Sequence, residues 1–296
     1  MNVLIAGGTG FIGSRLVQKL VEEDCHVYVL TRYPKQYQNS EHVTYISYQF
    51  PLKRLPTIHA VVNLAGESLF GYWTSEKKKQ ILASRISITE TLIQMMMQME
   101  TKPRVFVSAS AVGFYGMDET KIFTENTTKP GDDFLASVTV QWEKTAQIAE
   151  DLGIRTVYTR FGIVLDRKNG ALPLMSLPIK LFLGGKIGTG SQWISWIHID
   201  DCINLIMHII EDDSFFGPVN MTAPNPVTNE QFTKKLAQTL SRPAAITAPS
   251  PLIRLVLGEM HQLITSGQYV YPKKAIDKNF SFTFLYLEDA LQQIYQ

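Results

Sequence analysis

The sequence predicts an α/β fold: a doubly wound parallel sheet followed by a smaller C-terminal α/β region. Three observations predict it. Short apolar strands alternate with amphipathic helices in the first half, a glycine-rich turn joins the first strand to the first helix, and proline and glycine interrupt the second half. Because near-continuous apolar strands are typical of sheets buried on both sides, we expect helices on both faces.

The elements follow from hydrophobic periodicity. The expected strands are Asn2–Ala6, His26–Leu30, Val43–Ser47, Ala60–Leu64, Arg104–Ser108 and Arg155–Arg160. The expected helices between them are Phe11–Glu23, Glu76–Met99 and Thr139–Leu152. In the second half we expect irregular structure over Gly170–Gln192 and helices at Ile199–Ile210, from a Thr-x-x-Gln capping box at Thr228 to about Leu240, near Leu252–Leu263 and at Leu287–Ile294.

Composition excludes several classes of protein. The 296 residues are 45% hydrophobic and 19% charged, which is enough for a substantial core. A net charge of +1 argues against a dedicated nucleic-acid binder. Two cysteines, Cys25 and Cys202, cannot form a disulfide framework, and no apolar run is long enough for a membrane span. We expect a soluble protein in a reducing, cytoplasmic setting, with no membrane partner.

The segment Gly7–Gly13 reads Gly-Gly-Thr-Gly-Phe-Ile-Gly and directly follows the first expected strand. Such a turn lets backbone N–H groups approach a pyrophosphate at the positive end of the helix dipole, and Gly13 lets the helix pack closely on the strand. We therefore expect a Rossmann-type dinucleotide site with contacts from Gly7, Thr9, Gly10, Phe11, Ile12 and Gly13. The alternative is a tight turn that binds no ligand.

The end of the second strand indicates which dinucleotide binds. An acidic residue about 20 positions after the glycine turn would hold the ribose 2′-hydroxyl of NAD. Thr31 and Arg32 occupy this place instead, with Arg32 nineteen positions after Gly13. Because a guanidinium suits a bidentate contact with a 2′-phosphate, we expect NADP rather than NAD. An ordinary exposed arginine is the alternative for Arg32.

Two later strands end at the same edge of the sheet, where ligands collect in such folds. After the fourth strand, where the ribose and diphosphate of the cofactor would run, we expect contacts from Leu64, Ala65, Gly66 and Glu67. The fifth strand leads to Ser108, another expected cofactor contact, and to Ser110. A serine there can hydrogen-bond a substrate carbonyl or hydroxyl near the nicotinamide, although a simple strand cap would look much the same.

These segments resemble the extended short-chain dehydrogenase/reductase superfamily and, more narrowly, its epimerase family branch of NAD-dependent epimerase/dehydratase-like proteins. The motifs that carry the resemblance span almost the whole chain: Gly7–Gly13, Asn63–Glu67, Trp73 with Ser84-Arg85, Ser108–Gly116, Gly131–Leu135, Trp142-Glu143, Arg160–Gly162 and Trp196–Asp201. The tail Pro251–Ile294 resembles this branch's own C-terminal domain. The resemblance implies a cofactor contact by Arg160.

One departure from the superfamily affects the chemistry. Extended short-chain dehydrogenases carry Tyr-x-x-x-Lys on the helix after the serine strand, where the tyrosine is the acid/base. The corresponding segment, Phe134–Glu143, contains neither a tyrosine nor a lysine. We therefore take Ser110, Tyr115 and Glu143 as the candidate catalytic residues, with Glu67 as another carboxylate that could titrate if desolvated.

The segment His198-Ile199-Asp200-Asp201 could be mistaken for a metal site. Because it immediately precedes an expected helix, capping of that helix by an aspartate is the better interpretation, and we expect no metal.

Together, these observations predict an NADP-binding Rossmann domain at residues 1–165 and a substrate or lid region at 166–296. The latter includes the C-terminal domain at 249–296, with some chain crossing between the two parts. The expected function is an NADP(H)-dependent oxidoreductase or epimerase, monomeric or homodimeric, acting on a small molecule such as a sugar derivative. A non-catalytic NADP(H)-binding sensor or regulatory protein is the alternative.

Overall fold

The computed structural model describes residues 1–296, apart from the side chain of Leu252. Its main sheet is parallel throughout, with seven strands in the order β11-β7-β5-β4-β1-β2-β3 among the described residues. The strands are β1 (Asn2–Ala6), β2 (His26–Leu30), β3 (Val43–Ile46), β4 (Ala60–Asn63), β5 (Val105–Ala111), β7 (Arg155–Phe161) and β11 (Gly217–Met221). The predicted doubly wound fold is confirmed.

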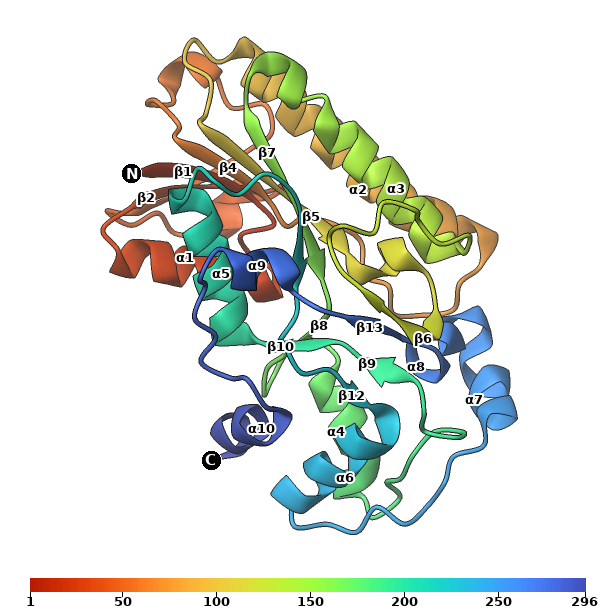
Figure 1. Cartoon of the computed structure of the whole chain (residues 1–296). Coiled ribbons are helices and arrows are strands. Elements are labelled where there is room, and N and C mark those ends of the chain that lie inside the picture. Colours follow the sequence, from red (N-terminus) through yellow and green to blue (C-terminus); the bar gives the residue numbers. More distant parts are fainter.

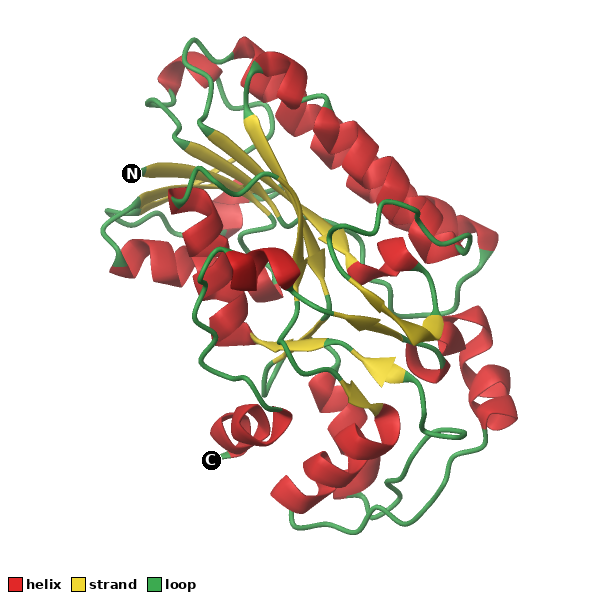
Figure 2. Ribbon diagram, viewed as in Figure 1, coloured by secondary structure: helices red, strands yellow, loops and turns green.

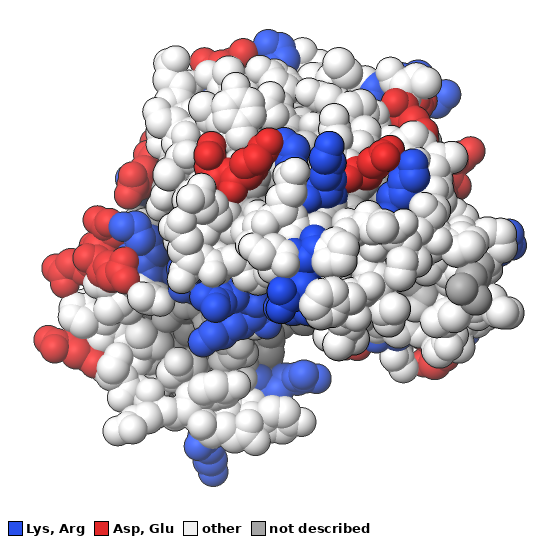
Figure 3. All heavy atoms as spheres, turned by 90° about the horizontal axis from the view of Figure 1, so that it is seen from below, with Lys and Arg blue, Asp and Glu red and all other residues white. Residues whose placement is uncertain are grey.

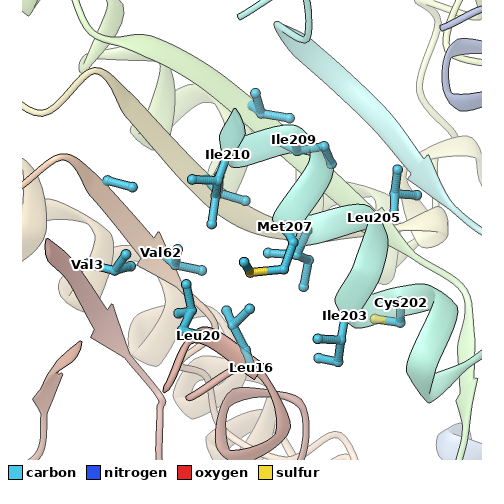
Figure 4. Close-up of a cluster of buried hydrophobic side chains, with 14 of the residues drawn as sticks. Val3, Leu16, Leu20, Val62, Cys202, Ile203, Leu205, Met207, Ile209 and Ile210 are labelled. Atoms are coloured by element: carbon cyan, nitrogen blue, oxygen red, sulfur yellow. The ribbon is translucent and has the colours of Figure 1, made fainter. Parts of the chain in front are cut away.

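Helices cover both faces of this sheet (Figures 1 and 2). On one face lie α1 (Phe11–Glu22) and α5 (Ile199–Glu211), and on the other α2 (Ser75–Gln98) and α3 (Phe134–Gln147). Because successive residues of a buried strand point to opposite faces, Val3 packs with α1 and α5, whereas Leu4 packs with α2. Figure 4 shows the first of these cores, in which Cys202 packs as a small apolar side chain.

Apart from α5, α9 (Lys273–Asp277) and β11, which lie with the main sheet, most of the second half of the chain lies below the carboxyl ends of β5 and β7 in Figure 1. The short strands there pair as β8 (Ile163–Leu165) with β10 (Trp196–His198) and β9 (Trp193–Ile194) with β12 (Val227–Thr228), while β13 (Gln268–Val270) pairs with β6 (Asp118–Phe123) from the first half. The other helices are α4 (Leu172–Lys180), α6 (Asn229–Thr239), α7 (Ser250–Leu257), α8 (Gln262–Thr265) and α10 (Leu287–Tyr295). A third core around Trp196 and Phe232 holds α4, α6 and α10 together.

Several expected elements have different bounds or were missed. The segment expected to be irregular contains α4, which tolerates Pro173 in its first turn and buries Leu172 and Ile179. Helix α3 begins at Phe134 rather than Thr139, because the Asp133 side chain accepts a hydrogen bond from the Ala136 N–H (2.9 Å) and caps the helix. The capping box of α6 is confirmed.

Strand β11 and helix α5 belong to the main sheet layer although they follow residue 165, so the chain crosses back at this boundary. Within the part of the chain that the structure describes, no helix is both long and apolar enough to traverse a lipid bilayer.

Candidate functional site

The glycine turn between β1 and α1 leaves no room for side chains. Gly7 has a φ of +82°, and a Cβ there would lie 2.7 Å from the Ala65 N atom. A Cβ on Gly13 would collide with the carbonyl oxygen of Gly7, and the Gly10 N–H donates to that same oxygen (2.9 Å). These contacts explain why glycine is needed at these places, and they bring the turn against the end of β4.

The N-terminus of helix α1 has no side-chain cap. Gly10 is the N-cap residue, and the first turn contains no acidic residue. Phe11 and Ile12 are partly buried against the core, whereas Thr9 is exposed. The first amides of a helix have no intrahelical acceptor, so this N-terminus fits a phosphate group.

The structure places Thr31 and Arg32 directly after β2. The Thr31 hydroxyl accepts a hydrogen bond from the Tyr33 N–H (3.3 Å), which shapes the turn. Arg32 is exposed, and no carboxylate forms an ion pair with it among the described residues. Its guanidinium is 5.9 Å from the centre of the Tyr33 ring. A solvent-facing cation at this strand end fits a 2′-phosphate.

The segment after β4 borders the glycine turn. A Cβ on Gly7 would lie 2.7 Å from the carbonyl carbon of Leu64, so Leu64 and Ala65 form the wall opposite the turn. Glu67 is exposed and pairs with Lys77 (Oε1 to Nζ, 2.7 Å), and this contact lowers the pKa of Glu67. The contact with Lys77 therefore favours the ionised form of the Glu67 carboxylate.

Ser110 near the end of β5, Arg160 near the end of β7 and Glu143 on α3 meet in one cluster. The Ser110 hydroxyl donates to Glu143 Oε1 (2.6 Å), and the guanidinium of Arg160 donates to both Glu143 oxygens through Nε and Nη2 (2.8 Å each). The side chains of Arg160 and Glu143 are only 4% and 11% exposed, so this is a buried, bidentate ion pair. Two of the three candidate catalytic residues are therefore in direct contact.

Arg160 is enclosed rather than exposed to a cleft. Its guanidinium carbon lies 3.5 Å from the centre of the Phe114 ring and 5.0 Å from that of Tyr115. Two of its nitrogens donate to Glu143. Holding this carboxylate is a structural role for Arg160, in addition to the cofactor contact that the resemblance implies. Ser108 is also buried, and its carbonyl accepts a hydrogen bond from Thr159 (3.2 Å).

Tyr115 lies in a closed environment. It is 4% exposed, its ring stacks on Phe123, and its hydroxyl donates to Asn220 Oδ1 (2.7 Å). Burial raises the pKa of Tyr115 to about 12. Because the phenol is already bonded to the protein and resists ionisation, the contacts favour packing in this turn, and its catalytic role stays a prediction.

Sequence reasoning missed the residues behind Tyr115. The side-chain oxygen of Asn220 on β11 accepts the hydrogen bond of the Tyr115 hydroxyl, and the backbone N–H of Asn220 donates to Glu125 Oε1 (3.0 Å). Glu125 is 7% exposed, and burial raises its pKa. No local pattern marks either residue, because their contacts join segments about 100 residues apart in the chain.

The segment after β10 is a helix cap, but the predicted capping residue is wrong. The cap of α5 is His198, whose Nδ1 accepts the Asp200 N–H (3.1 Å). Asp201 instead accepts the N–H groups of Thr283 and Phe284 (2.9 Å each), which fastens a distant loop to the helix. Over the described residues, no three His, Cys, Asp or Glu side chains gather in a way that could hold a metal ion.

Comparisons with known proteins agree with this geometry. Residues 3–220 match the model of the NAD dependent epimerase/dehydratase family, and residues 248–294 match a domain of unknown function, DUF1731. The chain is 44% identical over 298 residues to the epimerase family protein YfhF of Bacillus subtilis, covering 99% of this chain and 98% of that protein.

Solved structures of similar proteins also carry the epimerase name and the same fold. Human epimerase family protein SDR39U1, solved with NADPH, is 32% identical with a TM-score of 0.91, covering 100% of this chain and 99% of that one. UDP-glucuronic acid 4-epimerase from Bacillus cereus is 17% identical with a TM-score of 0.78, covering 100% and 98%, and shares the fold. With its glycine turn, parallel sheet and C-terminal region all matched, the chain belongs to the NAD dependent epimerase/dehydratase family, among the epimerase family proteins.

Proposed function

We propose that this protein is an NADP(H)-dependent oxidoreductase or epimerase that acts on a small molecule with a hydroxyl or carbonyl group, with sugar derivatives as the first class to test. The observation that carries the proposal is the glycine turn with an exposed Arg32 at the adjoining strand end. The NADPH in the human relative supports the choice of cofactor. We place the protein in the cytoplasm as a monomer or homodimer, without nucleic-acid or membrane partners.

The residues present fit the dinucleotide. The amides after Gly10 would hold the diphosphate, Arg32 the 2′-phosphate, and Leu64–Glu67 would flank the ribose side. Figure 3 shows Lys and Arg side chains gathered near the middle of the face seen from below, beside a hollow. When bound, the nicotinamide supplies hydride transfer.

Ser110 and Glu143 are the proposed proton-transfer residues. Because the Ser110 hydroxyl donates to Glu143, the lone pairs of its oxygen remain able to accept a hydrogen bond from a substrate hydroxyl. As the substrate hydroxyl loses its proton to Ser110, the Ser110 proton passes to Glu143; the reverse transfers protonate a substrate oxygen. Arg160 holds the carboxylate in place through its two donors.

The same contacts favour a second candidate function, a non-catalytic NADP(H)-binding sensor. Helix α3 carries no Tyr-x-x-x-Lys pair, and Glu143 is already neutralised by Arg160. A sensor would bind NADPH without consuming it in the presence of carbonyl or sugar-nucleotide substrates.

The deciding experiment is a fluorescence titration of the purified protein with NADPH and NADH, with Arg32→Ala alongside. Losing a charge-assisted contact costs roughly 1.5–3 kcal/mol, so we expect Arg32→Ala to weaken NADPH binding about tenfold or more and NADH binding little. Lys35→Ala, which removes an exposed cation a few residues away, is the matched control. If the wild-type protein binds neither nucleotide, the glycine turn is not a cofactor site and the proposal fails.

A further inference from the structure

Arg85 on α2 lies beside the segment Leu64–Glu67. Its Nη1 donates to two backbone carbonyls, those of Glu67 (3.1 Å) and Ile81 (2.9 Å). Among the described residues no carboxylate pairs directly with its charge, and the nearby Glu67 carboxylate pairs with Lys77 instead. A partly buried guanidinium bonded only to carbonyls is an unusual arrangement for a purely structural residue.

The remaining donors of Arg85, those on Nε and Nη2, have no protein partner among the described residues. Neither nitrogen is among the buried unpartnered atoms, so both remain accessible to solvent. Burial of the rest of the side chain lowers the pKa of Arg85 to about 10, which still leaves it charged at neutral pH. The side chain therefore offers two free nitrogens, with three N–H donors between them, and a full charge.

The surroundings hold this guanidinium at the ligand edge of the sheet. Its carbon lies 5.2 Å from the centre of the Trp142 ring, and a Cβ on Gly66 would be 3.4 Å from it. Gly66 belongs to the segment that flanks the glycine turn, at the carboxyl end of β4. Ligands bind outside such strand ends in doubly wound sheets, so Arg85 is placed to meet one.

Positive charge gathers around Glu67. Lys77, Arg32 and Arg85 all lower the pKa of its carboxyl group, and within the described structure only Lys77 forms an ion pair with it. A bound anion beside Arg85 would add a partner for this positive charge.

We propose that Arg85 binds an anionic oxygen group, a phosphate or a carboxylate, of the molecule that occupies this edge of the sheet. The inference rests on the proposed function, because it assumes a ligand at the glycine turn. Two sources share this chemistry: the diphosphate of the cofactor, and an acidic group on the substrate. A guanidinium binds either one through a pair of parallel N–H donors.

The test for the first source uses 2′-phospho-ADP-ribose, which keeps every phosphate of NADP and lacks the nicotinamide. Its affinity is measured by calorimetry for the wild-type protein, Arg85→Gln, Arg85→Lys and Lys79→Gln. Lys79 is exposed on the same helix, so Lys79→Gln removes one positive charge away from the site. If Arg85 binds the diphosphate, Arg85→Gln weakens binding roughly tenfold or more, Arg85→Lys weakens it less, and Lys79→Gln leaves it nearly unchanged.

The test for the second source titrates inorganic phosphate and acetate into the NADPH-bound protein, with tryptophan fluorescence as the readout. If the anion belongs to the substrate, Arg85→Gln binds 2′-phospho-ADP-ribose normally but loses the phosphate or acetate response. If neither titration differs between the wild-type protein and both Arg85 variants, the inference is wrong. Arg85→Lys serves as the test variant if Arg85→Gln does not fold, because it keeps the charge and loses the fork geometry.

Failure of the proposed function gives a different result. In that case the wild-type protein binds neither NADPH nor 2′-phospho-ADP-ribose. Inorganic phosphate is then titrated into the nucleotide-free wild-type protein and into Arg85→Gln, with tryptophan fluorescence as the readout. A fluorescence response that the variant loses supports the inference about Arg85, and equal responses of the two proteins overturn it.

Discussion

Among single residues, the ion pair of Glu143 with Arg160 should contribute to stability as well as to proton transfer. Both side chains are almost fully buried, so removing one charge leaves the other in a medium that solvates it poorly. We expect Glu143→Gln to lower the free energy of unfolding by about 3 kcal/mol, as measured by urea denaturation.

The double variant Glu143→Gln/Arg160→Gln is the control for this prediction. It removes both charges, so it should be less destabilised than the sum of the two single variants. A loss below about 1 kcal/mol in Glu143→Gln would mean that the pair behaves like a surface ion pair, in conflict with its burial.

The candidate site could be predicted only in part at this scale. The positions of Gly7, Gly10 and Gly13 followed from local spacing, because a turn of this kind is specified by adjacent residues. The hydrogen bonds of Glu143 could not be predicted in this way, because its partners Ser110 and Arg160 are 33 and 17 residues away in the chain. Contacts between strands and helices carry no short-range signal.

At the level of elements, the N-terminus of α1 is suited to bind a ligand, whereas that of α6 is capped by the protein itself and contributes to stability. Helix α1 begins at Gly10 without a side-chain cap, whereas Thr228 and Gln231 form a complete capping box on α6. We expect Thr228→Ala to lower the free energy of unfolding by about 1 kcal/mol, because the Gln231 N–H loses the Thr228 hydroxyl as its acceptor, and to leave NADPH affinity unchanged.

Thr91→Ala is the matched control for Thr228→Ala. Thr91 lies in mid-helix on α2, where its exposed hydroxyl donates only to the Ser87 carbonyl, so its loss should change stability by less than about 0.5 kcal/mol. Equal unfolding midpoints for the wild-type protein and Thr228→Ala would show that the capping box contributes nothing to stability.

Elements with strong periodicity or a clear cap were predictable, and short ones were not. Strands β1 and β2 have the predicted bounds, and α5 differs by a single residue at its end. The two-residue strands β9 and β12 are too short to show a period, and they exist because they pair with each other. Pro173 and Pro178 concealed α4, whose stability comes from burying its apolar face rather than from helix propensity.

In the whole molecule, long-range pairing fastens the second half of the chain to the first. Strand β11 extends the main sheet beyond β7, β13 pairs with β6, and Ala275 of α9 lies in the same core as Val3. The sequence showed where helices and strands alternate, but which strands pair depends on contacts between residues far apart in the chain. The sheet edge formed by β11 was therefore not predicted.

Tyr115 lies where these parts meet, and it should make the stability of the whole molecule sensitive to high pH. Its hydroxyl bonds Asn220 on β11 and its ring stacks on Phe123 of β6, with Arg160 and Glu125 nearby. Its pKa is about 12 in the folded protein and about 10 in the unfolded chain. The stabilisation is therefore fully present below pH 10 and is lost as the pH rises through 12, because the unfolded chain releases the proton first.

Tyr115→Phe removes the ionisable phenol of residue 115. The other tyrosines are present in both proteins, so the stability difference between the two reports on Tyr115 alone. Near pH 8 the variant should be less stable by about 1 kcal/mol, the usual contribution of one hydrogen bond. Two pKa units correspond to roughly 2–3 kcal/mol, so by pH 11.5 the difference should vanish or reverse. Urea unfolding at pH 8, 9.5 and 11.5 measures this change. A stability difference that stays constant over this range would show that the Tyr115 phenol ionises as readily in the folded protein as in the unfolded chain.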